Sequence, residues 1–330
     1  MNIFEKIYLF FYLKKKFKAI KNQKKLPFPV ISIGNINLGG TGKTPFTIAL
    51  AKEALQRGYE PIILTRGYRG RSKGPLFVTK ENSAEEVGDE PLLMAEEGLK
   101  VVKSIDRYKG GIYATQNLNL TSSNRVLFLL DDGFQHWQLY RNLDIILVDG
   151  MRDKPFGNYH LLPFGSLRSP LTELFDGDMI FITKKRNEFL YKKFKELGLK
   201  KVSFAPFKIE GIRNYEGKKI EPEGQKVFAF AGIGSFESFI NCLRELKLEI
   251  GEYRKFIDHK TYSEKLLKKL YRMSKDFDLI ITTKKDFIKI KDKASIFGEK
   301  LCYLDISIEI AKEDFEEIFQ KISTKHIDII

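Results

Sequence analysis

A glycine-rich segment that ends in Gly-Lys-Thr constrains this chain more than any other feature. It follows a predicted buried strand at Pro29–Asn35 and precedes a predicted helix at Thr44–Gln56. Glycines let backbone N–H groups close around phosphate oxygens, and the following helix adds the positive end of its dipole. Strand, loop and helix in this order predict an α/β fold with a phosphate-binding loop. The residues of this phosphate loop are Asn37, Leu38, Gly39, Gly40, Thr41, Gly42, Lys43 and Thr44.

Four side chains in and near the loop have the chemistry that nucleotide phosphates and their metal require. Lys43 would contact the β- and γ-phosphates, and the Thr44 hydroxyl would bind Mg²⁺. Asp131 and Asp132 end a predicted apolar strand, where a carboxylate orients the metal in such folds. Simpler interpretations stay open, because Gly-Lys-Thr can close an ordinary glycine turn and Asp-Asp-Gly a simple β-turn. The loop also departs from the usual pattern at Asn37, where glycine is expected.

Strands and helices alternate along the first two thirds of the chain. Apolar strands are expected at Pro61–Thr65, Arg125–Asp131 and Met179–Ile182, with helical segments between the strands, and this alternation predicts a parallel sheet. The residue pattern of 202–227 predicts short β segments with turns, and a second strand–turn–helix unit begins at Val227. We therefore predict an α/β protein with a P-loop NTPase-type parallel sheet domain and a second, smaller α/β domain that closes over the site. The expected boundaries are 1–25 for a basic arm, 26–205 for the P-loop domain and 206–330 for the smaller domain.

The chain is strongly basic, with 57 Lys and Arg residues against 43 Asp and Glu residues and a net charge of +14. Such an excess indicates a polyanionic partner, which is nucleic acid, acidic lipid or a phosphorylated substrate. Residues 1–25 hold eight lysines against one glutamate, and an apolar run at Ile7–Leu13 lies among them. This combination is typical of an amphipathic arm on an anionic membrane surface, although a helix packed on the domain with its lysines in water has the same pattern.

Other broad classes are excluded by what the sequence does not contain. No nucleic-acid-binding signature is present, so we expect no nucleic-acid partner. No apolar stretch approaches the ~20 residues that span a bilayer, and the apolar run near the N-terminus lacks a small-residue cleavage site. Two cysteines, Cys242 and Cys302, are too few for a disulfide framework. These features predict a cytoplasmic protein.

Three polar clusters each follow a predicted strand. They are Arg66–Arg71, Asp106–Gly110 and Asp131–His136. The carboxyl ends of parallel strands are where α/β proteins place their sites, and Arg and Lys side chains there would hold phosphate groups. An Asp among them could accept the proton of an attacking hydroxyl. Each cluster taken singly is equally typical of a solvated loop.

Several motifs occur in an order that closely resembles one enzyme family, the tetraacyldisaccharide 4'-kinases, which are the lipid A kinases of Gram-negative bacteria. The resemblance covers about residues 29–290 and is specific because so many separate motifs agree. These motifs are Gly39–Pro45, Arg66-Gly67-Tyr68, Gly88-Asp89-Glu90-Pro91, Asp131–His136, Leu162–Arg168, Phe230–Gly234, Asp258-His259 and Thr282–Asp286.

The resemblance implies transfer of the ATP γ-phosphate to the 4'-hydroxyl of the tetraacyldisaccharide 1-phosphate precursor of lipid A, with Mg²⁺, at the cytoplasmic face of the inner membrane. It implies two α/β/α domains with the site between them. It maps the catalytic base onto Asp106, working with His259, the nucleotide loop onto Asn37–Thr44, and the metal carboxylates onto Asp131 and Asp132. A lone histidine such as His259 is otherwise more often structural. The expected substrate-binding residues are Arg66, Tyr68, Arg107, Gln135 and Arg168.

Some positions depart from the family pattern, and two other classes of protein stay open. Ser169 stands where a carboxylate is common, Lys260 where a second histidine is frequent, and Lys284 where glutamate is common. The segment Thr283–Asp286 resembles a guanine-reading sequence, as in a P-loop GTPase or metallochaperone, although the Cys/His cluster of a metallochaperone is missing. The other class is a basic, nucleotide-regulated protein that binds a polyanion without catalysis.

Overall fold

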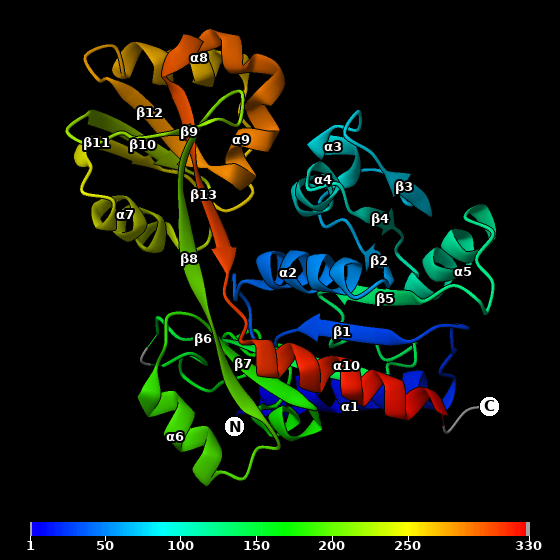
Figure 1. The fold of residues 1–330 in the computed structure, drawn as a ribbon. Coiled ribbons are helices and arrows are strands. Elements are labelled where there is room, and N and C mark those ends of the chain that lie inside the picture. Colours follow the sequence, from blue (N-terminus) through cyan, green and yellow to red (C-terminus); the bar gives the residue numbers. More distant parts are fainter. Residues whose placement is uncertain (1, 153, 328–330) are drawn as a thin grey trace.

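The computed structural model describes residues 2–152 and 154–327 and shows a mixed α/β protein. Its strands form one hydrogen-bonded path in the order β11-β10-β12-β13-β8-β7-β6-β1-β5-β2-β4-β3. At β8 the path passes from a larger, P-loop domain to a smaller, second domain that stands beside it in Figure 1. The predicted α/β class with a large parallel sheet is confirmed. The first residue of the predicted arm and the last three of the predicted second domain lie outside the described residues.

The P-loop domain is built on parallel strands, with one antiparallel strand, β3, at its edge. The central strands, such as β1, β5 and β7, are apolar along nearly their whole length because helices cover both faces of the sheet. The bounds are β1 Val30–Gly34, β2 Glu60–Thr65, β3 Leu76–Val78, β4 Lys100–Lys103, β5 Val126–Asp131, β6 Leu143–Asp149, β7 Met179–Lys184 and β8 Val202–Asn214.

The helices of this domain lie in two layers. Side chains of α2, α4 and α10 share one core cluster with alternate residues of β5 and β6, and α5, α6 and α1 pack on the opposite face. The sheet therefore has a covered core on each side. The bounds are α1 Ile3–Lys21, α2 Lys43–Gln56, α3 Ala84–Val87, α4 Asp89–Glu96, α5 Arg107–Asn117, η1 Leu171–Asp176, α6 Glu188–Glu196 and α10 Lys312–Ile327.

The second domain has its own small sheet and its own cores. Strands β10, β11, β12 and β13 are parallel, and β13 joins β8 in antiparallel register. The bounds are β9 Lys219–Ile220, β10 Lys226–Ala231, α7 Phe236–Glu245, β11 Glu249–Lys255, α8 Glu264–Met273, β12 Leu279–Thr283, α9 Lys284–Ile290, η2 Lys291–Ile296, η3 Gly298–Lys300 and β13 Leu301–Ile308.

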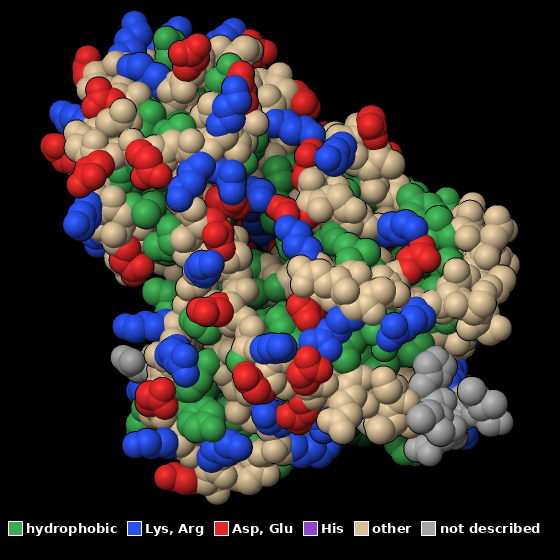
Figure 2. Space-filling model, viewed as in Figure 1, with side chains coloured by type: hydrophobic (Ala, Val, Ile, Leu, Met, Phe, Trp, Pro, Cys, Tyr) green, Lys and Arg blue, Asp and Glu red, His purple; other side chains and the backbone are tan. Residues whose placement is uncertain are grey.

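The two domains meet through one shared strand and through a charged contact. Strand β8 pairs with β7 up to Pro206 and with β13 from Phe207, so one strand belongs to both sheets. Away from β8, the acidic helix α4 contacts the basic helix α9, with ion pairs such as Lys285 to Glu90 at 3.2 Å. Figure 2 shows acidic and basic side chains interleaved where the domains meet. The division at 205/206 stays a prediction, and it falls inside β8.

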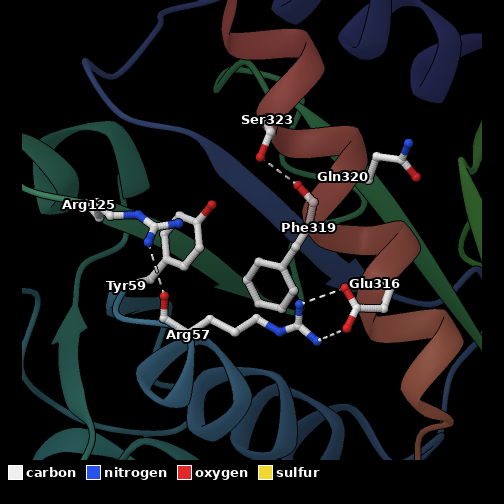
Figure 3. A pocket seen from close by; sticks show the side chains of 7 residues that line it. All are labelled: Arg57, Tyr59, Arg125, Glu316, Phe319, Gln320 and Ser323. Carbon is white, nitrogen blue, oxygen red and sulfur yellow. Dashed lines mark hydrogen bonds and ion pairs between the residues drawn. The ribbon is translucent and has the colours of Figure 1, made fainter.

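Helix α10 returns to the P-loop domain after β13, although the predicted division places residues 206–330 together. Its apolar residues Ile318 and Ile322 are buried in the core that α2 shares. At the end of α2, Arg57 donates to both carboxylate oxygens of Glu316, at 3.0 and 2.9 Å, and its guanidinium stacks on Phe319 (Figure 3). The C-terminal helix is therefore held by the larger domain.

Helix α1 packs on the P-loop domain by one face only. Asn2 caps it and forms a reciprocal capping box with Glu5. On the packed face, the buried Tyr12 hydroxyl lies 2.5 Å from Glu173 Oε2, and Glu5 accepts from the Leu161 amide. The opposite face leaves large apolar side chains in solvent, among them Phe17, which is 74% exposed. The helix in residues 1–25 therefore packs on the domain, as one of the two interpretations expects, while its role at a membrane surface stays a prediction.

The predicted strands and helices of the P-loop sheet agree with the structure, and so do the β segments and turns expected in residues 202–227. The first of these segments is longer than expected, because β8 is a single strand of 13 residues. Pro206 and Gly211 suggest breaks, but Pro206 lies where the partner strand changes, and Gly211 lies at a bulge with a φ of 123°. Strands β3, β11 and β13 were missed because they are short, polar or preceded by irregular turns.

Candidate active site

The phosphate loop leaves β1 at its carboxyl end and enters α2. Gly39 and Gly42 have φ angles of 115° and 83°, a backbone conformation that only glycine adopts without strain. The Thr183 hydroxyl at the end of β7, two strands away from β1, donates to the Thr41 carbonyl at 2.7 Å and holds the loop from that side. The loop therefore has the shape that the glycine pattern predicts.

Asn37 supports the loop at the position where glycine is usual. Its side chain is buried, and its amide donates to the Pro155 carbonyl at 3.1 Å. Its backbone also bridges to Leu167. The departure from the usual pattern thus ties the phosphate loop to the long segment that follows β6.

Asp131 and Asp132 stand beside the loop but have different surroundings. Asp131 ends β5 and is buried, and its Oδ1 atom has no hydrogen-bond partner among the described residues. Desolvation raises the pKa of Asp131 to about 7, helped by the charges of Glu90 and Asp132. Asp132 receives two hydrogen bonds from Arg168, at 2.8 and 3.1 Å, and lies 3.6 Å from Lys43 Nζ. Desolvation acts to raise the pKa of Asp132, but Lys43 and Arg168 outweigh it and hold that pKa below its usual range.

These residues fit a magnesium site. Mg²⁺ takes oxygen ligands and commonly uses one or two carboxylates together with substrate phosphates. The unpartnered, buried Oδ1 of Asp131 is a free carboxylate oxygen of this kind at the end of β5, and Thr44 is buried at the start of α2, which follows the neighbouring strand β1. Among residues 2–152 and 154–327 no cluster of three or more His, Cys, Asp or Glu side chains is arranged to bind a metal without phosphate.

The five expected substrate-binding residues have different places around this edge. Arg168 is engaged by Asp132 and by Asn35 Oδ1 at 2.5 Å. Gln135 donates to the Asn35 carbonyl and to Ser169, so it links the loop after β5 to the start of the phosphate loop. Arg107 is buried at the start of α5, where desolvation lowers its pKa to about 10. The other two, Arg66 and Tyr68, are exposed in the loop after β2.

Asp106 and His259 lie in separate groups of contacts. Asp106 caps α5, and its Oδ1 accepts from the amides of Tyr108 and Lys109 at 3.0 and 3.2 Å. No hydrogen bond or ion pair between Asp106 and His259 is present in the described structure. His259 instead lies 2.9 Å from Asp89, at the start of α4. The sequence places Asp89 in a family motif but assigns it no role.

The second domain reaches the phosphate loop through the turn after β10. A Cβ atom on Gly234 would lie 4.0 Å from the Gly40 amide nitrogen and 3.4 Å from Asp258. On the other side of this turn, Asp286 accepts from the Gly232 amide at 2.7 Å. The phosphate loop, the glycine turn of the second domain and the His259 loop therefore face one another between the domains.

Comparison with known proteins agrees with this geometry. A model of the tetraacyldisaccharide-1-P 4'-kinase family matches residues 2–324. The chain belongs to this family. Curated members include the tetraacyldisaccharide 4'-kinase of Aquifex aeolicus, which is 34% identical over 314 residues covering 90% of this chain and 89% of that protein. The one from Methylobacillus flagellatus is 35% identical over 316 residues, which cover 94% of this chain and 86% of that protein.

A solved structure of the family has the same fold. The crystal structure of LpxK from Aquifex aeolicus in complex with ATP matches with a TM-score of 0.73 and 31% sequence identity, over 97% of each chain.

Two segments that raised other interpretations have structural roles here. In the Thr283–Asp286 segment, Lys284 binds Glu97 and Asp305, and Asp286 is buried. A guanine-reading role for this segment is therefore not favoured. Ser169 is buried and lies 2.8 Å from the Tyr12 hydroxyl while it accepts from Gln135, so the missing carboxylate leaves no gap in this family member.

The surface hollow drawn in Figure 3 is not part of the active site. It is lined by Arg57, Tyr59 and Phe319, and it has a volume of about 390 Å³. Tyr59 and Arg125 precede β2 and β5, so the hollow lies at the amino ends of the parallel strands. The phosphate loop lies at the carboxyl ends, where α/β folds bind their ligands.

Proposed function

We propose that this chain transfers the γ-phosphate of ATP to the 4'-hydroxyl of tetraacyldisaccharide 1-phosphate, the lipid A precursor. The observation that carries this proposal is the phosphate loop beside the buried carboxylate of Asp131, whose Oδ1 atom has no hydrogen-bond partner among the described residues, in a chain that belongs to the 4'-kinase family. The loop supplies a nucleotide site, and the family supplies the acceptor.

Positioning and charge do most of the work in such a reaction. The loop amides between Asn37 and Thr44 hold the β- and γ-phosphates, and Lys43 neutralises charge that spreads over the transferring group. Thr44, Asp131 and Asp132 would hold Mg²⁺, which shields the phosphate oxygens when it is bound. Arg168 restrains Asp132 and so keeps one carboxylate in a single orientation.

Proton removal from the acceptor hydroxyl falls to Asp106 and His259. A carboxylate alone is a weak base for a sugar hydroxyl, and an imidazole can take the proton onward. The two residues come from different domains, so a closing movement would be needed to bring them together, and it would also exclude water. Arg66, Tyr68, Arg107 and Gln135 lie in loops and at a helix start on the carboxyl side of the sheet, and they would contact the phosphorylated disaccharide.

The direct test is phosphate transfer from radiolabelled ATP to purified tetraacyldisaccharide 1-phosphate, with the Asp106→Ala variant in parallel. We expect labelled product with the parent chain and about 10²–10⁴-fold less with the variant, the usual contribution of a general base. Thermal unfolding checks that the variant folds. A parent chain that makes no labelled lipid, or that prefers GTP, would refute the proposal.

The acceptor is a lipid, and α1 is suited to meet it at an anionic membrane surface, the cytoplasmic face of the inner membrane. No described helix is both long and apolar enough to cross a bilayer. Aromatic side chains on the exposed face of α1, such as Phe10 and Phe11, would enter the headgroup boundary. Lysines that follow them would meet anionic lipid. The exposed apolar residues of α1 are Ile3, Phe4, Ile7, Phe10, Phe11, Leu13, Phe17 and Ile20.

The same helix leads directly to the phosphate site. The Tyr8 hydroxyl donates to the Arg168 carbonyl at 2.9 Å, and Arg168 holds Asp132. At the other end, the rings of Phe4 and Phe164 lie 5.8 Å apart, so the apolar surface continues onto the segment that carries Arg168. A lipid held on this surface would present its sugar close to the phosphate loop.

Vesicle binding tests the membrane surface. Replacing Phe10, Phe11 and Phe17 by Ser should weaken binding to anionic vesicles at least about tenfold, because burying each Phe contributes roughly 1.5–3 kcal/mol. Stability should change little, since these side chains are exposed. Leu55→Ser, which replaces an exposed apolar residue on α2 away from this surface, is the control. Unchanged binding of the triple variant in a flotation assay would refute the membrane role of α1.

A further inference from the structure

A line of polar side chains runs from helix α1 to the start of the phosphate loop. Its first members are Tyr12 of α1 and Glu173 of η1, which are 8% and 4% exposed. The Tyr12 hydroxyl lies 2.5 Å from Glu173 Oε2 and 2.8 Å from the hydroxyl of the buried Ser169. Gln135 Nε2 then donates to Ser169 Oγ at 2.9 Å and to the Asn35 carbonyl at 2.7 Å. The line therefore joins α1 to the residue that follows β1.

The chemistry of these groups gives each hydrogen bond one direction. Glu173 is the ion-pair partner of Lys16, whose ammonium lies 2.7 Å from Oε1, and its carboxylate only accepts. Tyr12 therefore gives its single hydroxyl proton to Glu173, and burial beside this carboxylate raises the pKa of Tyr12, so the proton stays in place. The Ser169 hydroxyl then donates to the Tyr12 oxygen while its own oxygen accepts from Gln135. This arrangement satisfies every group in the line.

Helix α1 does not need these hydrogen bonds in order to pack. The ring of Tyr12 already meets Trp137 edge to face at 5.1 Å, in an apolar cluster that includes Ala19. A buried carboxylate such as Glu173 costs free energy unless its oxygens are paired, and an apolar side chain of similar size often stabilises a fold as well. Fully paired polar networks chiefly fix the positions of their members. We therefore expect the line to serve position more than stability.

Asn35 is where the line meets the phosphate chemistry. Its side chain is buried, and its Oδ1 accepts from Arg168 at 2.5 Å and from Lys43 at 3.5 Å. Its Nδ2 donates to the Gly39 carbonyl at 3.4 Å, inside the phosphate loop. Arg168 in turn holds Asp132 by two hydrogen bonds. A displacement of Asn35 would therefore move the phosphate-binding lysine and a metal-site carboxylate together.

We propose that Tyr12 is a positioning residue for phosphate transfer: its hydroxyl, acting through Ser169 and Gln135, holds the start of the phosphate loop in place. This inference rests on the proposed function, in which the loop and Lys43 bind the nucleotide phosphates. These groups stabilise the transferring charge only when they lie within hydrogen-bond distance of it, so a small displacement lowers the rate. The helix that would meet the lipid thus also supports the chemical step.

The two faces of α1 should therefore have separable effects. Phe10, Phe11 and Phe17 lie on the exposed face, and their replacement should weaken vesicle binding. Tyr12 lies on the packed face, so removal of its hydroxyl should leave vesicle binding unchanged and lower kcat.

The first experiment compares the kinetics of the parent chain and Tyr12→Phe, which keeps the ring and removes the hydroxyl. At saturating lipid, kcat should fall about tenfold with little change in the KM for ATP, the loss typical when a residue that orients a metal site is changed. The control is Tyr191→Phe, which removes a hydroxyl from a ring of α6 stacked on Phe204. Trp137 is the only tryptophan of the chain, and its fluorescence emission should stay unchanged because the ring contact remains.

Two results of this experiment would overturn the proposal. One is a kcat for Tyr12→Phe equal to that of the parent. The other is a lower kcat accompanied by a shifted Trp137 emission, because the loss would then come from altered packing of α1 and not from the hydrogen bonds.

A double variant tests whether the hydroxyls act as one line. Ser169→Ala removes the middle hydroxyl and should lower kcat by a factor similar to that of Tyr12→Phe. Adding Tyr12→Phe to Ser169→Ala should cause little further loss, because the line is already broken. Losses that multiply in the double variant would show that the two hydroxyls act independently and would overturn the proposal.

Hydrogen exchange measures the phosphate loop without any activity. In the full chain, amides of residues 35–44 should exchange about 2–10-fold faster in Tyr12→Phe than in the parent, as expected for the loss of one net hydrogen bond. Peptides from α1 should exchange as in the parent. Unchanged exchange of residues 35–44 would overturn this inference even in an active kinase. A parent chain that makes no labelled lipid would refute the proposed function, while the exchange rates would still decide whether Tyr12 holds the loop.

Discussion

The two halves of the candidate site are assembled in different ways. Lys43, Asp131 and Asp132 belong to one strand–loop–helix unit and the strand beside it, and β1 and β5 are hydrogen-bonded neighbours. Asp89 and His259 are 170 residues apart in the chain and meet only where α4 contacts the second domain. The first group is organised by local structure, and the second depends on the arrangement of two domains.

This difference predicts different sensitivities. A cluster built on adjacent parallel strands stays in place as long as one domain folds. The geometry of a cluster that spans two domains changes whenever the contact between the domains changes. Such contacts are expected to open at a lower free energy than the core of one domain. Substitutions in the local cluster should therefore affect chemistry directly, whereas those in the contact should act through closure.

The largest effect is expected at Lys43. Lys43→Met should lower kcat by about 10²–10³-fold, the usual loss when one group that stabilises transition-state charge is removed. The fold should survive because Asp132 keeps both hydrogen bonds from Arg168. The control is Lys52→Met, which removes another lysine of the same helix, one that pairs with Glu97. Turnover close to that of the parent would show that the local cluster does not handle the phosphates.

A smaller effect, on stability, is expected at Asp131. Its pKa is raised to about 7 in the folded chain, so the folded state binds a proton that the unfolded state loses near pH 4. Without metal, stability should therefore fall as pH rises from about 4 to 7, and Asp131→Asn should remove this fall. In EDTA, the variant should gain roughly 1–3 kcal/mol over the parent between pH 5 and pH 8.

Thermal unfolding of both proteins across this pH range makes the measurement. The control is Asp276→Asn, which removes an exposed carboxylate of the second domain. A parent and an Asp131→Asn variant with parallel pH profiles would show that Asp131 is already ionised in the folded chain.

The smallest effect is expected at the contact between the domains. Lys291→Gln removes the ion pair with Glu96, and because both side chains are partly exposed it should cost less than about 1 kcal/mol. The loss should shrink at high salt, which screens such pairs. Urea unfolding at low and high salt measures this, with Lys268→Gln, whose partner Glu264 lies on the same helix, as control. A cost that is large and independent of salt would show that the contact is not electrostatic.

Local patterns predicted the P-loop side of the molecule well. The strand before the phosphate loop, the glycine positions with positive φ and the carboxylates at the end of β5 all follow from short-range chemistry. The β segments and turns of residues 202–227 were also predicted, but the length of β8 was not, because a strand shared by two sheets is defined by its partners and not by its own composition. For the same reason, the sequence places α10 in the second domain, whereas its apolar face is buried in the core of the P-loop domain.

The sequence alone determined the α/β class, the phosphate loop and the resemblance to a lipid kinase family, because each rests on residues that are close in the chain. Only the tertiary structure decided which groups touch His259 and which oxygen of Asp131 is unpartnered. Both depend on distances between residues far apart in the chain. Net charge shows the same limit: it indicates an anionic partner, but only the packing of α1 shows which apolar side chains stand beside the lysines in solvent.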